Sequence, residues 1–297
     1  MKRTFLKFVT LVTIATVPFT VDAAGFSHSD SAVEAARRVN ISGRQRMLSQ
    51  RISKAACFIS SGISADGFTT QLDAAVSLFD TSLDALFNGD SAIGLGAEHN
   101  TEILNVLGLV ESDWAVFSGA LQALQGGEIA SLEMLSQIDS KGLQLLANMN
   151  RAVNITAKTY GESLPDMPLI LSVTIDLAGR QRMFTQKAAK EYCLISAGVD
   201  VDENRVRLAE TVNLFSRTLE ALQVGMSGIV IAAPNEQISE QLSAVAIAWN
   251  GPKAALEQVA RGVDISNGQQ NAIVNDMEQV LVLMNEAVGM YEEAIPD

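Results

Sequence analysis

Residues 43–62 read GRQRMLSQRISKAACFISSG, and residues 179–198 read GRQRMFTQKAAKEYCLISAG. Eleven of the twenty positions are identical when Gly43 is aligned with Gly179. The match continues downstream and has slipped by one position where Trp114 aligns with Trp249, which indicates that one loop changed length. A repeat of this size indicates that one structural unit occurs twice in the chain.

Turn residues divide each copy into four stretches. In the first copy they are 64–67, 88–90 and 126–127, where Gly, Asn and Asp gather. Gly251-Pro252 should kink or interrupt the third helix of the second copy, because Pro lacks the helical donor. We predict helices over 30–62, 68–88, 98–125 and 129–160, and then over 168–198, 203–224, 236–261 and 266–293.

The composition favours the same fold class. Hydrophobic residues make up 48% of the chain but aromatic residues only 5%, and there are 6 prolines, a balance that suits helices. We therefore expect an all-α fold of two tandem antiparallel four-helix bundle modules that form an intramolecular pseudo-dimer.

The N-terminus has the pattern of a secretory signal. Lys2, Arg3 and Lys7 precede an apolar run over 8–17, and Ala23 offers a small residue for cleavage. A retained anchor is the alternative, but the run is short for a bilayer core of roughly 30 Å. We predict a signal peptide over 1–23, helical modules over 24–164 and 165–297, and a periplasmic location.

Charge and motifs exclude several function classes. Without residues 1–23 the chain holds 18 Lys and Arg against 33 Asp and Glu, a net charge of 18 − 33 = −15. This field repels nucleic acid, although a local pair of arginines can still hold a small anion. We find no metal-ligand spacing, phosphate loop or nucleophile beside a base. We therefore expect no enzyme activity, metal or cofactor.

The repeated segment carries two stripes. One is an ordinary apolar stripe that includes Leu48 and Ile52. The second stripe, here called the seam, has 3-4-3-4-3 spacing and holds mostly small residues, which let two helices approach closely. Its members are Gly43, Arg46, Gln50, Ser53, Cys57 and Ser60 in the first copy, and Gly179, Arg182, Gln186, Ala189, Cys193 and Ser196 in the second.

Topology predicts how the two seams meet. An up-down-up-down unit returns its chain to the starting end, so the first helices of the two copies should pack in parallel. Arg46 would then meet Arg182, and Cys57 would meet Cys193. A disulfide between the cysteines is expected in an oxidising compartment, with two separate buried thiols as the alternative.

Two adjacent buried guanidinium groups need compensation, because desolvated like charges are costly and Arg keeps its proton. We see no acidic residue on either seam near the arginines. Either an external anion neutralises them, or they pair with a carboxylate from another helix or point to solvent.

The segments Gly43–Arg51 and Gly179–Lys187 resemble the signature of the PilJ/NarX-type sensor-domain family. This family comprises the periplasmic domains of type IV pilus chemotaxis transducers and of nitrate/nitrite sensor kinases. In the nitrate sensors, one arginine from each of two subunits holds a nitrate at the two-fold axis. The resemblance implies that Arg46 and Arg182 bind the ligand. We add their seam neighbours as candidate ligand-binding residues: Gly43, Gly179, Gln50 and Gln186.

The expected function is that of a soluble periplasmic sensory protein. It would bind a small oxyanion, with nitrate or nitrite favoured, between its two repeats. Because no kinase or methyl-accepting segment is present, it would communicate with a membrane receptor or transporter. The alternative is a ligand-free periplasmic scaffold or interaction module.

Overall fold

The computed structural model describes residues 28–62, 67–163 and 169–294. The first copy contains α1 (His28–Ser61), α2 (Phe68–Asn88), a 3-10 turn (Ser91–Ile93), α3 (Thr101–Gly119), the short α4 (Gln122–Gln125) and α5 (Leu132–Ser163). The second contains α6 (Leu169–Ala197), α7 (Val201–Val224), α8 (Glu236–Ala260) and α9 (Asn267–Glu293). The all-α prediction is confirmed. The predicted signal peptide lies outside the described residues.

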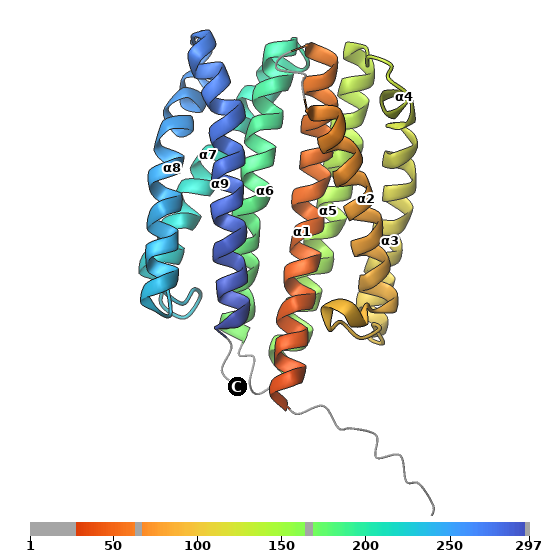
Figure 1. The fold of residues 1–297 in the computed structure, drawn as a ribbon, viewed down its shortest axis with the longest axis vertical. Helices are drawn as coiled ribbons and strands as arrows, with labels where there is room; N and C mark the ends of the chain where they lie inside the picture. The colour runs from red at the N-terminus through yellow and green to blue at the C-terminus, as the bar shows by residue number, and fades with distance from the viewer. Residues whose placement is uncertain (1–27, 63–66, 164–168, 295–297) are drawn as a thin grey trace, which may run out of the picture.

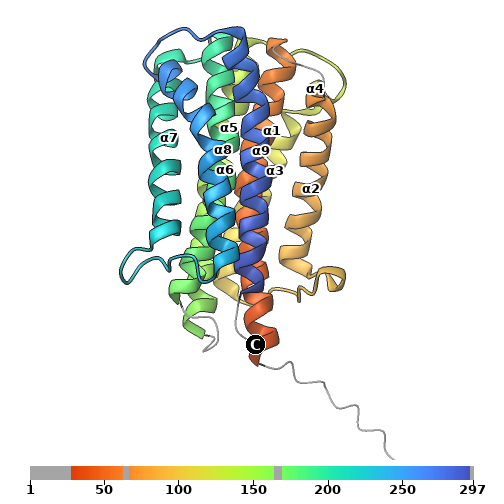
Figure 2. The same cartoon turned by 60° about the vertical axis from the view of Figure 1, so that its left-hand side comes forward.

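Two bundles of antiparallel helices lie side by side (Figure 1). Helices α1, α2, α3 and α5 form one bundle, and α6 to α9 form the other. Helices α1 and α6 lie at the centre, run parallel and make the most extensive contact in the molecule. Helix α5 also packs on α6, and a smaller contact joins α1 to α9. In the turned view of Figure 2, α9 crosses in front of α1, and α2 and α7 lie at opposite sides.

The repeat is visible in the turns as well as in the helices. Gly89 and Gly225 end α2 and α7 with φ angles of 77° and 79°. A side chain at Gly89 would be strained at this angle, and its Cβ would lie 2.6 Å from the backbone carbon of Gly96. Gly89 and Gly225 are equivalent positions of the repeat, and the positive φ angle favours glycine at both.

The slip in the alignment lies just after these glycines. An isolated β-bridge joins Asp90 to Leu95 in the first copy and Met226 to Val230 in the second, so the second loop is one residue shorter. Asn100 and Asn235, which are equivalent once this deletion is counted, then cap α3 and α8 with their side-chain oxygens.

The cores repeat too. Phe79 stacks on Trp114 with ring centroids 4.0 Å apart, and Phe215 packs against Trp249 at 4.2 Å. Each indole donates a hydrogen bond to the second helix of its own bundle, to Asp80 or Ser216.

Two details differ from the predicted helices. The third helix of the first copy breaks at residues 120–121 into α3 and α4. Helix α8, in contrast, continues through Pro252, so the proline does not interrupt it. None of the described helices combines the length and apolar character that a membrane crossing requires.

Candidate functional site

A disulfide between Cys57 and Cys193 joins α1 to α6 near their C-terminal ends, with the two Cα atoms 6.1 Å apart. Each cysteine is fully buried. The predicted disulfide is confirmed, and it holds the two seams in parallel register.

Eleven residues before the cysteines, the two seams bring Arg46 and Arg182 together. A Cβ placed on Gly43 would lie 3.3 Å from an Nη2 atom of Arg46 and 3.5 Å from Nη2 of Arg182. A Cβ placed on Gly179 would lie 3.5 Å from both Nη2 atoms. The glycines therefore leave room for two guanidinium groups between closely packed helices.

Arg46 is neutralised by a carboxylate of the other repeat. Its side chain is fully buried, and Nη2 lies 2.7 Å from Oδ1 of Asp176 on α6. Nη1 donates to Oδ1 of Asn150 on α5 at 3.3 Å, and Nη2 also donates to the backbone oxygen of Asp176 at 3.3 Å. The Nε–H is buried without a partner among the described residues.

Arg182 is held by amides instead. It is 2% exposed, and it donates to Oδ1 of Asn40 at 2.7 Å and to Oδ1 of Asn285 at 3.0 Å. Within the described ranges it forms no ion pair, and its Nε–H has no partner. The amide of Asn40 separates it from Glu292, to which Asn40 donates at 2.6 Å.

The two arginines occupy equivalent surroundings with one substitution. Asn150 and Asn285 are equivalent positions of the two copies, and so are Asn40 and Asp176. The repeat therefore places an amide beside one guanidinium and a carboxylate beside the other. The prediction that no acidic residue lies near the pair is wrong for Arg46, because Asp176 lies three residues before Gly179 on the same stripe.

Burial shapes the electrostatics of the pair. Burial, together with the charges of Arg44 and Arg46, lowers the pKa of Arg182 to about 9. Burial also lowers the pKa of Arg46, while Asp176 acts to raise it. Arg182 therefore remains a cation at neutral pH, and arginine in general keeps its proton in proteins. Asp176 is in addition shared with the half-exposed Arg180, at 2.8 Å.

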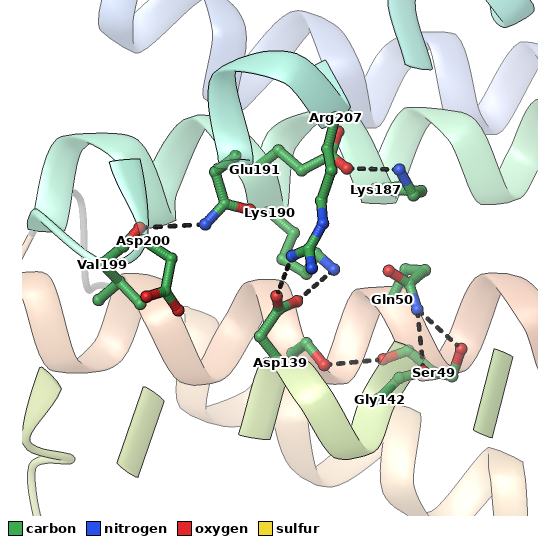
Figure 3. Close-up of polar contacts among 12 residues, drawn as sticks. Ser49, Gln50, Asp139, Gly142, Lys187, Lys190, Glu191, Val199, Asp200 and Arg207 are labelled. Atoms are coloured by element: carbon green, nitrogen blue, oxygen red, sulfur yellow. Dashed lines mark hydrogen bonds and ion pairs between the residues drawn. The ribbon is translucent and has the colours of Figure 1, made fainter. Parts of the chain in front are cut away.

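The two seam glutamines are buried one turn beyond the arginines and make no hydrogen bond to them. Gln50 donates to Ser49 and to the backbone oxygen of Gly142, as Figure 3 shows. Gln186 accepts a hydrogen bond from Arg51 at 3.3 Å. As the side chains stand, the glutamines brace the seam rather than contact the arginine pair.

Buried lysines tie each central helix to the last helix of the other bundle. Lys54 on α1 pairs with Glu278 on α9, and Lys190 on α6 pairs with Asp139 on α5. Figure 3 shows Asp139 held between Lys190 and Arg207, with Arg207 at 2.9 Å. These cross-bundle pairs lie between the arginines and the disulfide along the chain, so ion pairs also fix α1 and α6 in this region. Among the described residues, no group of His, Cys, Asp and Glu side chains could hold a metal ion.

The geometry agrees with a comparison against known families. The model of the type IV pili methyl-accepting chemotaxis transducer N-terminal domain, PilJ, matches residues 28–140 and again residues 171–281. The chain belongs to the PilJ family. Its two matches correspond to the two bundles, so this PilJ chain carries two tandem copies of a sensory domain. No curated protein matches the chain.

Sequence reasoning missed the polar partners of the PilJ arginines. Continuing the seam one step backward, by three residues, reaches Asn40 and Asp176. Asn150 and Asn285 were visible as a repeated Met-Asn pair on the fourth helices. Only the structure shows that these amides reach the arginines.

Proposed function

We propose that the chain is a periplasmic sensory protein that binds one small oxyanion, nitrate or nitrite, between Arg46 and Arg182. The observation that supports this most is Arg182, a guanidinium that is 2% exposed, adjoins a second arginine and forms no ion pair within the described residues. A planar oxyanion accepts paired hydrogen bonds from such groups, and both Nε–H donors are free to make them.

Charge favours a monovalent anion. Among the buried side chains, Arg46 and Arg182 carry two positive charges and Asp176 one negative charge, so a single negative charge neutralises these three. The charges of Arg44, Arg180 and Glu292 also act on this cluster, but these side chains are partly exposed. A divalent oxyanion would leave a buried excess of negative charge, which is costly in a low-dielectric site.

Binding has a structural consequence in this proposal. The disulfide fixes α1 and α6 at one end, and the arginines lie about 16 Å away along the helices. An anion that enters between the arginines must separate the helices slightly, and the displacement is greatest at their N-terminal ends. We propose that a membrane partner responds to this displacement of the helices.

The second candidate is a ligand-free scaffold. The contacts of Arg46 with Asp176 and of Arg182 with Asn40 and Asn285 favour it, because they already satisfy part of each guanidinium. The two functions differ in their response to anions.

A thermal-shift panel of nitrate, nitrite and sulfate tests the proposal. Nitrate or nitrite at 100 times its dissociation constant should stabilise the protein by about 2.7 kcal/mol, and sulfate should do so much less. Arg182→Gln should abolish the shift. Arg217→Gln, at an exposed position of α7, should keep it. Equal shifts in the wild type and in Arg182→Gln, or no shift at all, would favour the scaffold.

A further inference from the structure

A second polar site lies at the disulfide end of the second bundle. A cavity of about 380 Å³ opens among α6, α7, the end of α8 and the loop into α9. Its polar lining comprises Tyr192, Ser196, Arg205, Asp264 and Gln270. None of these residues contacts the arginine pair, so the cavity is separate from the proposed anion site.

Three polar groups that line this cavity, on Tyr192, Arg205 and Asp264, make few contacts with the described part of the chain. Tyr192 is 1% exposed, and its hydroxyl lies beside Ser196 without a well-directed hydrogen bond to it. Among the described residues, the one ion pair of Arg205 is a long contact of 3.7 Å with the fully exposed Asp202, and its buried Nε–H has no hydrogen-bond partner there. Asp264 is exposed and forms no ion pair among the described residues.

Comparison with the first bundle shows that the fold does not require these groups. At the equivalent positions, Ala56 replaces Tyr192, Thr69 replaces Arg205 and Ile129 replaces Asp264. Gly262 is retained as Gly127, and both have positive φ. A Cβ on Gly262 would lie 3.3 Å from the guanidinium carbon of Arg205, so the guanidinium packs closely against this turn.

We infer that this cavity binds a small zwitterion of the α-amino-acid class. Arg205 and the Tyr192 hydroxyl supply donors for a carboxylate, and Asp264 supplies an acceptor for an ammonium group. Charge-assisted hydrogen bonds of this kind are stronger than neutral ones. The ring of Tyr192 also packs against Phe58 of α1, with centroids 6.4 Å apart, so an occupied cavity contacts the junction of the two bundles beside the disulfide.

Titration calorimetry with the twenty standard amino acids tests this inference, with acetate and methylammonium as probes that carry only one of the two charges. At least one amino acid should bind, and neither single-charge probe should match it. Arg205→Gln should weaken that binding by more than about tenfold, and Tyr192→Phe, which removes only the hydroxyl, by about three- to tenfold. Arg217→Gln on the same helix should bind like the wild type.

Two results would overturn the inference: no heat with any amino acid, or binding that is unchanged in both Arg205→Gln and Tyr192→Phe. Arg182→Gln separates this site from the proposed anion site. It should retain amino-acid binding whether or not nitrate binds to the protein.

Discussion

At the scale of single residues, the molecule is a near-symmetric pair of sites with one decisive difference. Asn40 and Asp176 occupy the same position of the repeat, yet only Asp176 brings a charge. This difference gives Arg46 a carboxylate partner, whereas Arg182 has amide partners and forms no ion pair within the described ranges. The repeated seam predicted that the two arginines would meet. It did not predict their asymmetry, because Asn40 and Asp176 lie just before the segment of strongest identity.

Asp176→Asn should give Arg46 the same amide neighbour that Asn40 provides for Arg182. It removes the carboxylate that Arg46 and Arg180 share. Because an unpaired buried charge is left behind, the unfolding free energy should fall by about 3–5 kcal/mol. Nitrate should then restore more stability than it adds to the wild type. Urea unfolding with and without nitrate measures both effects.

The matched control is Glu240→Gln, at an exposed position of α8, which should change the stability by less than about 0.5 kcal/mol. An Asp176→Asn protein as stable as this control would show that the ion pair with Arg46 contributes little.

At the scale of elements, the central helices are fixed by buried lysines. Burial lowers the pKa of Lys54 to about 8, although Glu278 acts to raise it. The unfolded chain therefore binds more protons than the folded chain between about pH 8 and 10.5, the usual lysine range. In this window the contribution of Lys54 to stability increases with pH. The partly buried Tyr160 and the buried Tyr291 act in the opposite direction from about pH 10, because desolvation raises the pKa of both hydroxyls.

Lys54→Met isolates the lysine contribution. It removes the titrating group, so the wild type should gain stability relative to this variant as the pH rises from 8 to 10. The tyrosines are common to both proteins and cancel in the difference. Urea unfolding at pH 7, 8, 9 and 10 gives the comparison. A difference that stays constant over this range would mean that the pKa of Lys54 is not lowered.

The helices themselves were largely predictable. The turn residues and the repeat predicted the ends of the helices within a few residues, because Gly, Asn and Asp occur between the helices at equivalent positions of both copies. The break after Gly119 and the continuity through Pro252 were not predicted. Local propensity favours a break at Pro252, but its side chain is buried and the helix continues.

At the scale of the whole molecule, a disulfide cross-links the two bundles in addition to the backbone that connects them. The disulfide closes a loop with a sequence separation of 136. Its position could be predicted because the cysteines repeat at the same offset as the arginines, and parallel packing then brings both pairs together. The partners of the arginines come from four helices. Asn40 and Asp176 continue the seams by one step, but no spacing within one segment reveals that Asn150 and Asn285 contact the arginines.

Cys57→Ser with Cys193→Ser tests what the bond contributes. In the chain-entropy model, removing the cross-link that closes a loop of this length should lower the unfolding free energy by about 4–5 kcal/mol. Unfolding of the variant and of the oxidised wild type in guanidinium chloride measures the change. The reduced wild type should behave like the variant. If the double variant were as stable as the oxidised protein, the seam contacts alone would account for the pairing of the bundles.

The most direct test of the anion proposal is titration calorimetry of nitrate and nitrite into the wild type, Arg46→Gln, Arg182→Gln and Arg217→Gln. The proposal predicts one bound anion per chain in the wild type and in Arg217→Gln, and no measurable binding in either seam variant, because a single guanidinium supplies only half of the hydrogen-bond donors and half of the positive charge that hold the anion. Absence of heat in the wild type, or binding that persists in both Arg46→Gln and Arg182→Gln, would contradict it.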